Sequence, residues 1–128
     1  SIKNPAEKKI SIGNESEIDG KILSISKVKK DEVKIGKTKN VEFISADGLN
    51  SFFIVRIWEQ GDKFFPIGMQ GSKKISDYLN DIKINSFEKK EQLVLENKGN
   101  IVWVIGKRLD DRFKVTPNTK KVLKLCLK

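Results

Sequence analysis

The chain has 128 residues, of which 26 are Lys or Arg and 17 are Asp or Glu, and its formal net charge is +9. A chain of this length can form one self-supporting core, and 38% hydrophobic with 34% charged residues is typical of a folded domain. The chain contains no His, which excludes a Ser-His-Asp triad, a Cys-His pair and zinc sites that need an imidazole ligand.

Cysteine content and hydropathy indicate the kind of compartment in which such a chain works. Cys126 is the only cysteine, so no intrachain disulfide can form, and a free thiol is typical of a reducing compartment, here the cytoplasm. The longest apolar run, residues 101–105, is far shorter than the roughly 20 residues of a membrane-spanning helix. The chain begins with neither an initiating Met nor a signal sequence, which predicts a piece of a longer protein.

Short strands are predicted for the first half of the chain. Residues 21–28 mix β-branched and polar residues and end at the charged cluster 29–32, which favours a turn. Residues 41–45 and 51–58 have the same character and flank a second turn at Asp47-Gly48, where Gly accepts a positive φ.

The periodicity changes to that of a helix between residues 72 and 82, where four apolar residues share one face: Ile75, Tyr78, Leu79 and Ile82. Ser72 can cap the start of this helix, and Lys73 and Asp77 are spaced for a salt bridge on the opposite face. A second, shorter helix can begin at Asn85, because a Glu follows it at the spacing of a capping box.

The C-terminal third predicts strands again. Residues 92–96 and 101–105 are apolar and are separated by a four-residue loop, as in a β-hairpin. Residues 122–128 alternate Leu with Lys or Cys, so this strand should be half-buried, with Cys126 on the face away from the leucines. The predicted fold class is α+β: a small mixed β-sandwich or barrel-like sheet of about six short strands, with one clear helix over about 72–82 and room for a second short one.

The positive charge makes a polyanion such as a nucleic acid the default partner. Surface lysines also serve solubility alone, so composition by itself leaves binding and mere solubility equally open. A cluster of basic residues in a shaped loop would favour binding.

Residues 56–74 form the most unusual segment of the chain and predict such a loop. Conformations or close approaches that a side chain would hinder are expected at its shaping residues, Gly61, Asp62, Pro66, Gly68 and Gly71. Backbone amides near a helix start suit a phosphate group, although the residue order of a Walker loop is absent. The expected nucleic-acid contacts are Lys73 and Lys74, then Lys63 and Arg56, then Lys83 and Arg112. The alternative for Lys73 and Lys74 is a solvated helix face.

Several other residues are more simply explained by packing or local structure. Trp103 lies in an apolar run and is expected in the core rather than against a base, and Met69 is expected to fill a gap in the core. The aspartates lack the spacing of a calcium loop, so turn caps and salt bridges are expected of Asp62, Asp77, Asp81, Asp110 and Asp111. We expect no catalytic residue and no metal ligand in this chain.

A series of short motifs resembles, in order and in spacing, the C-terminal domain of tRNA(Ile)-lysidine synthetase over about residues 41–128. The motifs are Arg56, Gly61-Asp62-Lys63, Pro66-Ile67-Gly68-Met69, Gly71-Ser72-Lys73-Lys74, Asp77-Tyr78-Leu79, Asp81-x-Lys83, Ile101-Val102-Trp103-Val104-Ile105-Gly106 and Asp110-Asp111-Arg112-Phe113-Lys114-Val115. The chain departs from the family at Asn85, where Pro is common, and at Lys89, where Arg is common. Asn85 can still cap a helix, whereas Lys89 lacks the planar fork that binds a phosphate in a bidentate manner.

This resemblance implies a function for the domain and for the enzyme around it. Enzymes of the family use ATP and Mg²⁺ to adenylate the wobble cytidine of the isoleucine tRNA with a CAU anticodon, and lysine then displaces AMP to give lysidine. That chemistry belongs to an N-terminal ATP-pyrophosphatase domain, whose Ser-Gly-Gly-x-Asp-Ser loop is absent here, so no cofactor is expected in this domain.

The same resemblance implies that residues 1–128 are a single C-terminal tRNA-binding domain, with 1–40 as a variable lead-in. Its partners would be the tRNA body near the acceptor stem and the enzyme's own catalytic domain. An interdomain docking or structural module without a specific nucleic-acid site is the alternative. A free-standing enzyme ranks last, because no spacing of residues favours a Lys- or Asp-based mechanism.

Overall fold

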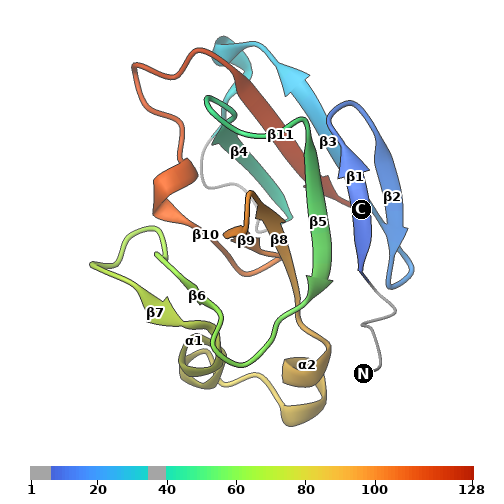
Figure 1. Cartoon of the computed structure of the whole chain (residues 1–128), viewed down its shortest axis with the longest axis vertical. Coiled ribbons are helices and arrows are strands. Elements are labelled where there is room, and N and C mark those ends of the chain that lie inside the picture. Colours follow the sequence, from blue (N-terminus) through green and yellow to red (C-terminus); the bar gives the residue numbers. More distant parts are fainter. Residues whose placement is uncertain (1–6, 35–39) are drawn as a thin grey trace.

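Two antiparallel sheets make up most of the computed structural model, which describes residues 7–34 and 40–128 (Figure 1). The five-stranded sheet has the order β1-β5-β8-β9-β10, formed by Lys8–Ser11, Phe52–Ile57, Leu93–Asn97, Asn100–Val104 and Arg108–Leu109. The four-stranded sheet has the order β2-β3-β11-β4, formed by Glu15–Ile18, Lys21–Val28, Val122–Leu127 and Val41–Ser45. The smaller elements are the ribbon of β6 (Lys63–Phe64) and β7 (Lys73–Lys74), the helices α1 (Ile75–Asp81) and α2 (Ser86–Glu91), and the 3₁₀ turns η1 (Lys30–Glu32) and η2 (Asp111–Phe113).

The main hydrophobic core is built from the inner faces of the two sheets. Because side chains alternate along a strand, Leu23 and Ile25 of β3 share the inner face with Leu123 and Leu125 of β11, and all four are buried. Leu125 lies directly opposite Ile25 in the register of the two strands. The five-stranded sheet contributes its own buried side chains to this core, among them Phe53, Val55, Leu95 and Trp103. The prediction that Trp103 is a core residue is confirmed.

Helix α1 and the β6–β7 ribbon cover the outer face of the five-stranded sheet. Ile75, Tyr78 and Leu79 of α1 are buried in a second cluster with Phe64 of β6 and apolar residues of β8 and β9. The rings of Phe64 and Tyr78 meet edge to face, with centroids 5.2 Å apart. Strands β8 and β9 are therefore covered on both faces, which explains why their sequences are continuously apolar and do not alternate.

The start of α1 differs from the prediction. The helix begins at Ile75, and Ser72 does not cap it, because Lys73 and Lys74 first pair with β6 as strand β7. Lys73 therefore leaves the helical spacing that would bring it to Asp77, and it forms its salt bridge with Asp81 at the far end of α1. The apolar stripe on which the helix was predicted is buried as expected.

Three other local expectations have different outcomes. Asn85 caps α2, as predicted, and its Oδ1 accepts a hydrogen bond from the Glu88 backbone N–H at 2.7 Å. Met69 is 43% exposed, so the prediction that it fills the core is wrong; it lies at the end of a tight turn, where its N–H donates to the Pro66 carbonyl. Cys126 alternates with the leucines of β11 and so lies on the other face of the strand. It is nevertheless buried, so this strand is covered on both faces at that position.

The predicted α+β class is confirmed, and the structure has more strands than the six expected. Residues 8–28 supply β1 to one sheet and β2 and β3 to the other, so the N-terminal segment is part of both sheets. Three two-residue strands account for the other additions. In the described part of the chain, no helix is long and apolar enough to cross a membrane.

Candidate nucleic-acid interface

The glycine-rich loop leaves the end of β5 and returns through the β6–β7 ribbon to α1, and Arg56 fixes its first half. Arg56 Nε donates to Glu96 of β8 at 2.6 Å, and its terminal nitrogens donate to both carboxylate oxygens of Asp62 at 2.9 and 3.1 Å. Burial lowers the pKa of Arg56, but the hydrogen bonds to Asp62 and Glu96 outweigh this effect and raise the pKa above its usual value. The guanidinium is therefore paired with two carboxylates, and a third, that of Glu59, lies 4.0 Å away.

Asp62 extends this attachment to the loop backbone. Its carboxylate also accepts from the Glu59 N–H at 2.7 Å, and its carbonyl accepts from the N–H of Ile75, the first residue of α1. Gly61 precedes it with a φ of +93°, a conformation that side chains other than Gly rarely adopt. The turn at Gly61-Asp62 is thus tied to both β5 and α1.

Asp110 fixes the middle of the loop from the opposite side. Its fully buried carboxylate accepts from the Phe65 N–H at 2.9 Å and from the backbone N–H and guanidinium of Arg112 at 2.8 to 3.0 Å. The Phe65 carbonyl accepts in turn from the Asp111 N–H. The Arg112 guanidinium lies 4.4 Å from the centre of the Phe65 ring, and its side chain is 39% exposed.

Arg108 fixes the tip of the loop, a role that was not predicted from the sequence. Its Nη1 donates to the Ile67 carbonyl at 2.9 Å, and the Ile67 N–H donates to the Leu109 carbonyl at the same distance. Gly68 follows with a φ of +84°. The signal in the sequence was an arginine directly before the Leu109-Asp110 pair, but only the fold brings residues 108–110 beside the loop.

The lysines at the ends of the β6–β7 ribbon are the least compensated charges of the loop. Lys63 and Lys74 are direct partners across the ribbon, and both are exposed. Directly opposite side chains project to the same face with Cβ atoms about 5 Å apart, so the two ammonium groups repel each other. Neither forms an ion pair within residues 7–34 and 40–128. An anion bound between them would relieve this repulsion.

The remaining predicted contacts are placed differently. Lys73 is engaged by Asp81, whereas Lys83 is exposed in the turn after α1 and has a φ of +60°. The structure therefore brings Lys63 and Lys74 together, and it gives carboxylate partners to Arg56, Lys73 and Arg112. This arrangement can bind an anion. Among the described residues, no group of three His, Cys, Asp or Glu side chains could hold a metal ion.

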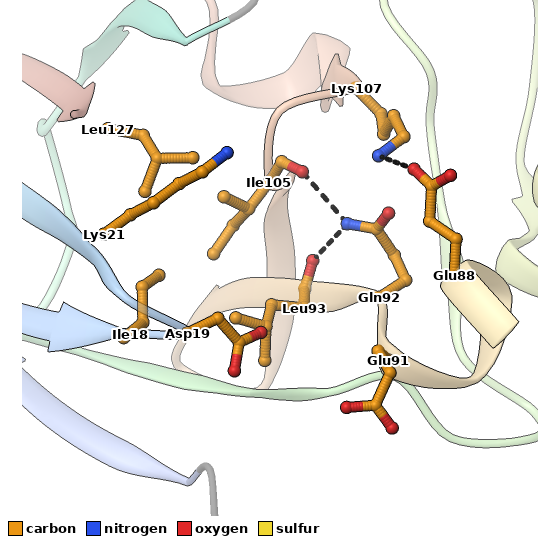
Figure 2. A pocket seen from close by; sticks show the side chains of 10 residues that line it. All are labelled: Ile18, Asp19, Lys21, Glu88, Glu91, Gln92, Leu93, Ile105, Lys107 and Leu127. Carbon is orange, nitrogen blue, oxygen red and sulfur yellow. Dashed lines mark hydrogen bonds and ion pairs between the residues drawn. The ribbon is translucent and has the colours of Figure 1, made fainter.

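A separate cavity of about 230 Å³ lies between the β2–β3 turn, α2 and the end of β9 (Figure 2). Its lining mixes Lys21 and Lys107 with three carboxylates, and Lys107 is paired with Glu88 at 3.1 Å. The Gln92 side chain donates to the Leu93 and Ile105 carbonyls, which closes the inner wall. Because its charges are mixed, this cavity has no preference for a polyanion.

Replacing Asp110 by Asn tests how the loop is fixed. We expect Asp110→Asn to lower the free energy of unfolding by about 2 to 3 kcal/mol, because the charge-assisted bonds to Arg112 are lost inside the protein. Asp111→Asn is the matched control; its partly exposed pair with Lys114 should contribute less than about 1 kcal/mol. Urea denaturation of both variants measures the difference, and equal effects would contradict the role given to Asp110.

The protein is thus a small two-sheet α+β domain that presents a pair of lysines on a firmly attached loop. The family model described as the TilS substrate C-terminal domain matches residues 53–125, more than half of the chain. The chain belongs to this family.

Relatives with curated names agree with this assignment. The tRNA(Ile)-lysidine synthase of Parabacteroides distasonis is 42% identical over 89 residues, which cover 70% of this chain and 20% of the relative. That of Clostridium perfringens is 36% identical over 133 residues, which cover 99% of this chain and 27% of the relative, so the similarity includes the N-terminal strands. The chain thus spans about a fifth to a quarter of the length of these relatives.

A solved structure supports the fold independently. The crystal structure of a TilS C-terminal domain matches with a TM-score of 0.80, over 95% of this chain and 96% of that chain, at 16% sequence identity. Such a low identity shows a shared fold and leaves the site to be argued from the residues themselves.

Proposed function

We propose that this domain binds the body of a tRNA near its acceptor stem, on the surface formed by the β6–β7 ribbon. The observation that carries the proposal is the exposed pair Lys63 and Lys74, which are partners across the ribbon, form no ion pair with any described residue and lie on a loop attached at three points. Duplex RNA is recognised mainly by shape, through phosphate and 2′-hydroxyl contacts, so a basic surface without stacking aromatic residues is sufficient.

The residues divide into two roles under this proposal. Lys63 and Lys74 contact phosphates directly, and the exposed side chains of Lys83 and Arg112 extend the surface. Lys73 can contribute by leaving its pair with Asp81, which is an exposed pair of low energy. Arg56 maintains the shape of the loop through Asp62 and Glu96 and is the least available of the predicted contacts.

We further propose that the domain serves an ATP-dependent ligase. The name of the relatives, tRNA(Ile)-lysidine synthase, supports tRNA as the RNA, and the isoleucine tRNA with a CAU anticodon is the one that the sequence resemblance implies. In the proposed enzyme, ATP and Mg²⁺ act in a separate catalytic domain, and the tRNA is modified in the cytoplasm. This domain holds the tRNA body while that domain modifies the wobble cytidine.

A docking module is the second candidate, and one observation favours it. Phe87 of α2 is 76% exposed, which is unusual for a large apolar side chain and suits a contact with another domain. Docking through an apolar contact depends little on salt. Binding to phosphates releases counterions, so the logarithm of the affinity falls with the logarithm of the salt concentration by roughly one unit for each phosphate contact.

The salt dependence of RNA binding tests the proposal. Fluorescence anisotropy with a labelled acceptor-stem RNA hairpin, measured over a series of salt concentrations, should give a slope of about −3 to −5 for the three to five basic side chains placed on this surface. A variant Phe87→Ser should bind the hairpin as the unchanged chain does. The absence of hairpin binding at low salt would leave docking as the better function.

A further inference from the structure

The open end of the sandwich, far from the β6–β7 ribbon, contains a second cationic feature. A cavity of about 490 Å³ lies where β3 ends, β11 begins and the loop between β4 and β5 passes. These strand ends lie at the top of Figure 1, whereas the ribbon lies toward the bottom. The volume is within the range of about 300 to 1,000 Å³ that is typical of small-molecule sites.

The positions of its lysines are unexpected for a β-sandwich. Along β3 the inner-face residues are Leu23, Ile25 and then Lys27, and Lys27 lies opposite Leu123 in the register. Lys121 lies two residues before Leu123 and so continues the same alternation. Two lysines thus occupy positions at the end of the core where the strand pattern calls for apolar residues.

The cavity combines positive charge with an apolar floor. Lys27, Lys120 and Lys121 line it, together with Ser51 and with apolar side chains that include Ile12, Ala46 and Leu49. Among the described residues, none with a carboxylate belongs to the lining. The three ammonium groups form no ion pair within the part of the chain that the structure describes. A ligand that satisfies this lining has an anionic group and an apolar face in one unit.

The rim of the cavity is already ordered by hydrogen bonds. The Asp47 carboxylate accepts from the backbone N–H groups of Lys120 and Lys121, both at 2.9 Å, and the Ala46 N–H donates to the Lys121 carbonyl. These hydrogen bonds hold the pKa of Asp47 below its usual range. The buried Asn97 side chain bonds Asn50 in both directions. A ligand would therefore meet a preformed site, which lowers the entropic cost of binding.

We propose that this cavity takes one unpaired nucleotide of the same RNA whose duplex lies on the β6–β7 ribbon, an inference that rests on the function proposed above. The base lies against the aliphatic floor at Ala46 and Leu49, and the adjoining phosphate lies among the three lysines. A nucleotide fits because it supplies a flat apolar face and a charge in one unit, and its neighbours along the strand continue to a duplex. An acidic peptide segment supplies the charge without the flat face.

The test compares a blunt RNA duplex with the same duplex carrying a short single-stranded extension at its 3′ or 5′ end. By anisotropy, one of the extended duplexes should bind the full chain about tenfold more tightly than the blunt duplex does, the gain expected for one charge-assisted contact between a lysine and a phosphate. The double variant Lys27→Met with Lys121→Met should lose this gain. The control pair Lys124→Met with Lys128→Met removes the same charge from outside the cavity lining and should keep it.

Folding and the occupant are checked separately. Met at position 27 or 121 adds apolar surface to the inner face, so the Tm should not fall, and the methyl resonances of Ala46 and Leu49 should shift only with the extended duplex. Blunt-duplex binding without any gain from either extension overturns this inference and leaves the proposed function standing. A gain that persists in the cavity variant also overturns it. The absence of binding to all the duplexes overturns both proposals.

Discussion

Reversing both ribbon lysines, Lys63→Glu with Lys74→Glu, should weaken binding to an RNA duplex by about 100-fold. Each lysine is expected to contribute one charge-assisted contact of about 1.5 kcal/mol, and two such contacts correspond to about two powers of ten in Kd. The salt slope should also become shallower by about two, since two phosphate contacts are lost. Anisotropy titrations at several salt concentrations measure both quantities.

A control pair separates the site from general electrostatics. Lys29→Glu with Lys124→Glu produces the same change in net charge near the outer side of the four-stranded sheet, where both residues line a shallow surface hollow. We expect this pair to weaken binding much less than the ribbon pair does. Equal losses for the two pairs would contradict a site at the ribbon and would indicate attraction by net charge alone.

The single reversal Lys63→Glu distinguishes binding from folding with one substitution. It places opposite charges across the ribbon, which should raise the free energy of unfolding by about 0.2 to 1 kcal/mol. The same change should weaken RNA binding by more than tenfold, because an attraction to phosphate becomes a repulsion. A loss of stability would show that the two lysines do not face each other as described.

Arg56→Met should lower the free energy of unfolding by about 2 to 3 kcal/mol, an effect as large as that expected for Asp110→Asn. Removing one partner of a buried ion pair costs about 3 to 5 kcal/mol. The cost is smaller here because the side chains of Asp62 and Glu96 are 16% and 19% exposed, so water partly solvates their charges. Urea denaturation gives the value, and Arg56→Lys should be intermediate because it keeps the charge without the fork.

The same variants separate the two roles that are conceivable for Arg56. If Arg56 maintains the loop, the triple variant Arg56→Met, Asp62→Asn, Glu96→Gln should recover part of the lost stability, because no unpaired charge is left behind. The salt slope of RNA binding for this folded triple variant should match that of the unchanged chain. A slope that is shallower by about one, together with an unchanged stability of Arg56→Met, would make Arg56 a phosphate ligand instead.

Local patterns predicted the fold wherever a single periodicity decided the structure. The apolar stripe of Ile75, Tyr78 and Leu79 predicted α1, a mixture of β-branched and polar residues predicted β3, and alternation predicted β11. The start of α1 was not predictable in this way, because Lys73 and Lys74 are drawn into a strand by β6, a tertiary pairing that overrides the capping preference of Ser72.

The candidate site was predictable in its location but not in its internal pairing. The glycines and lysines of residues 56–74 indicated the loop from sequence alone. The partners that fix the loop come from distant segments: Glu96 lies 40 residues after Arg56, and Asp110 lies 45 residues after Phe65. No local pattern encodes such contacts. Arg56, which was predicted from the sequence to contact nucleic acid, is therefore paired with carboxylates in the fold. The exposure of Met69 likewise depends on a turn fixed by distant bonds.

Under the proposed function, the surface at the β6–β7 ribbon recognises duplex RNA by its shape. The most direct test compares an acceptor-stem RNA duplex with a DNA duplex of the same length and sequence, each titrated with the chain over a salt series. We expect tighter binding to RNA than to DNA at every salt concentration, because 2′-hydroxyl contacts and A-form geometry do not depend on salt. Equal affinities for RNA and DNA that vanish together as salt rises would contradict it.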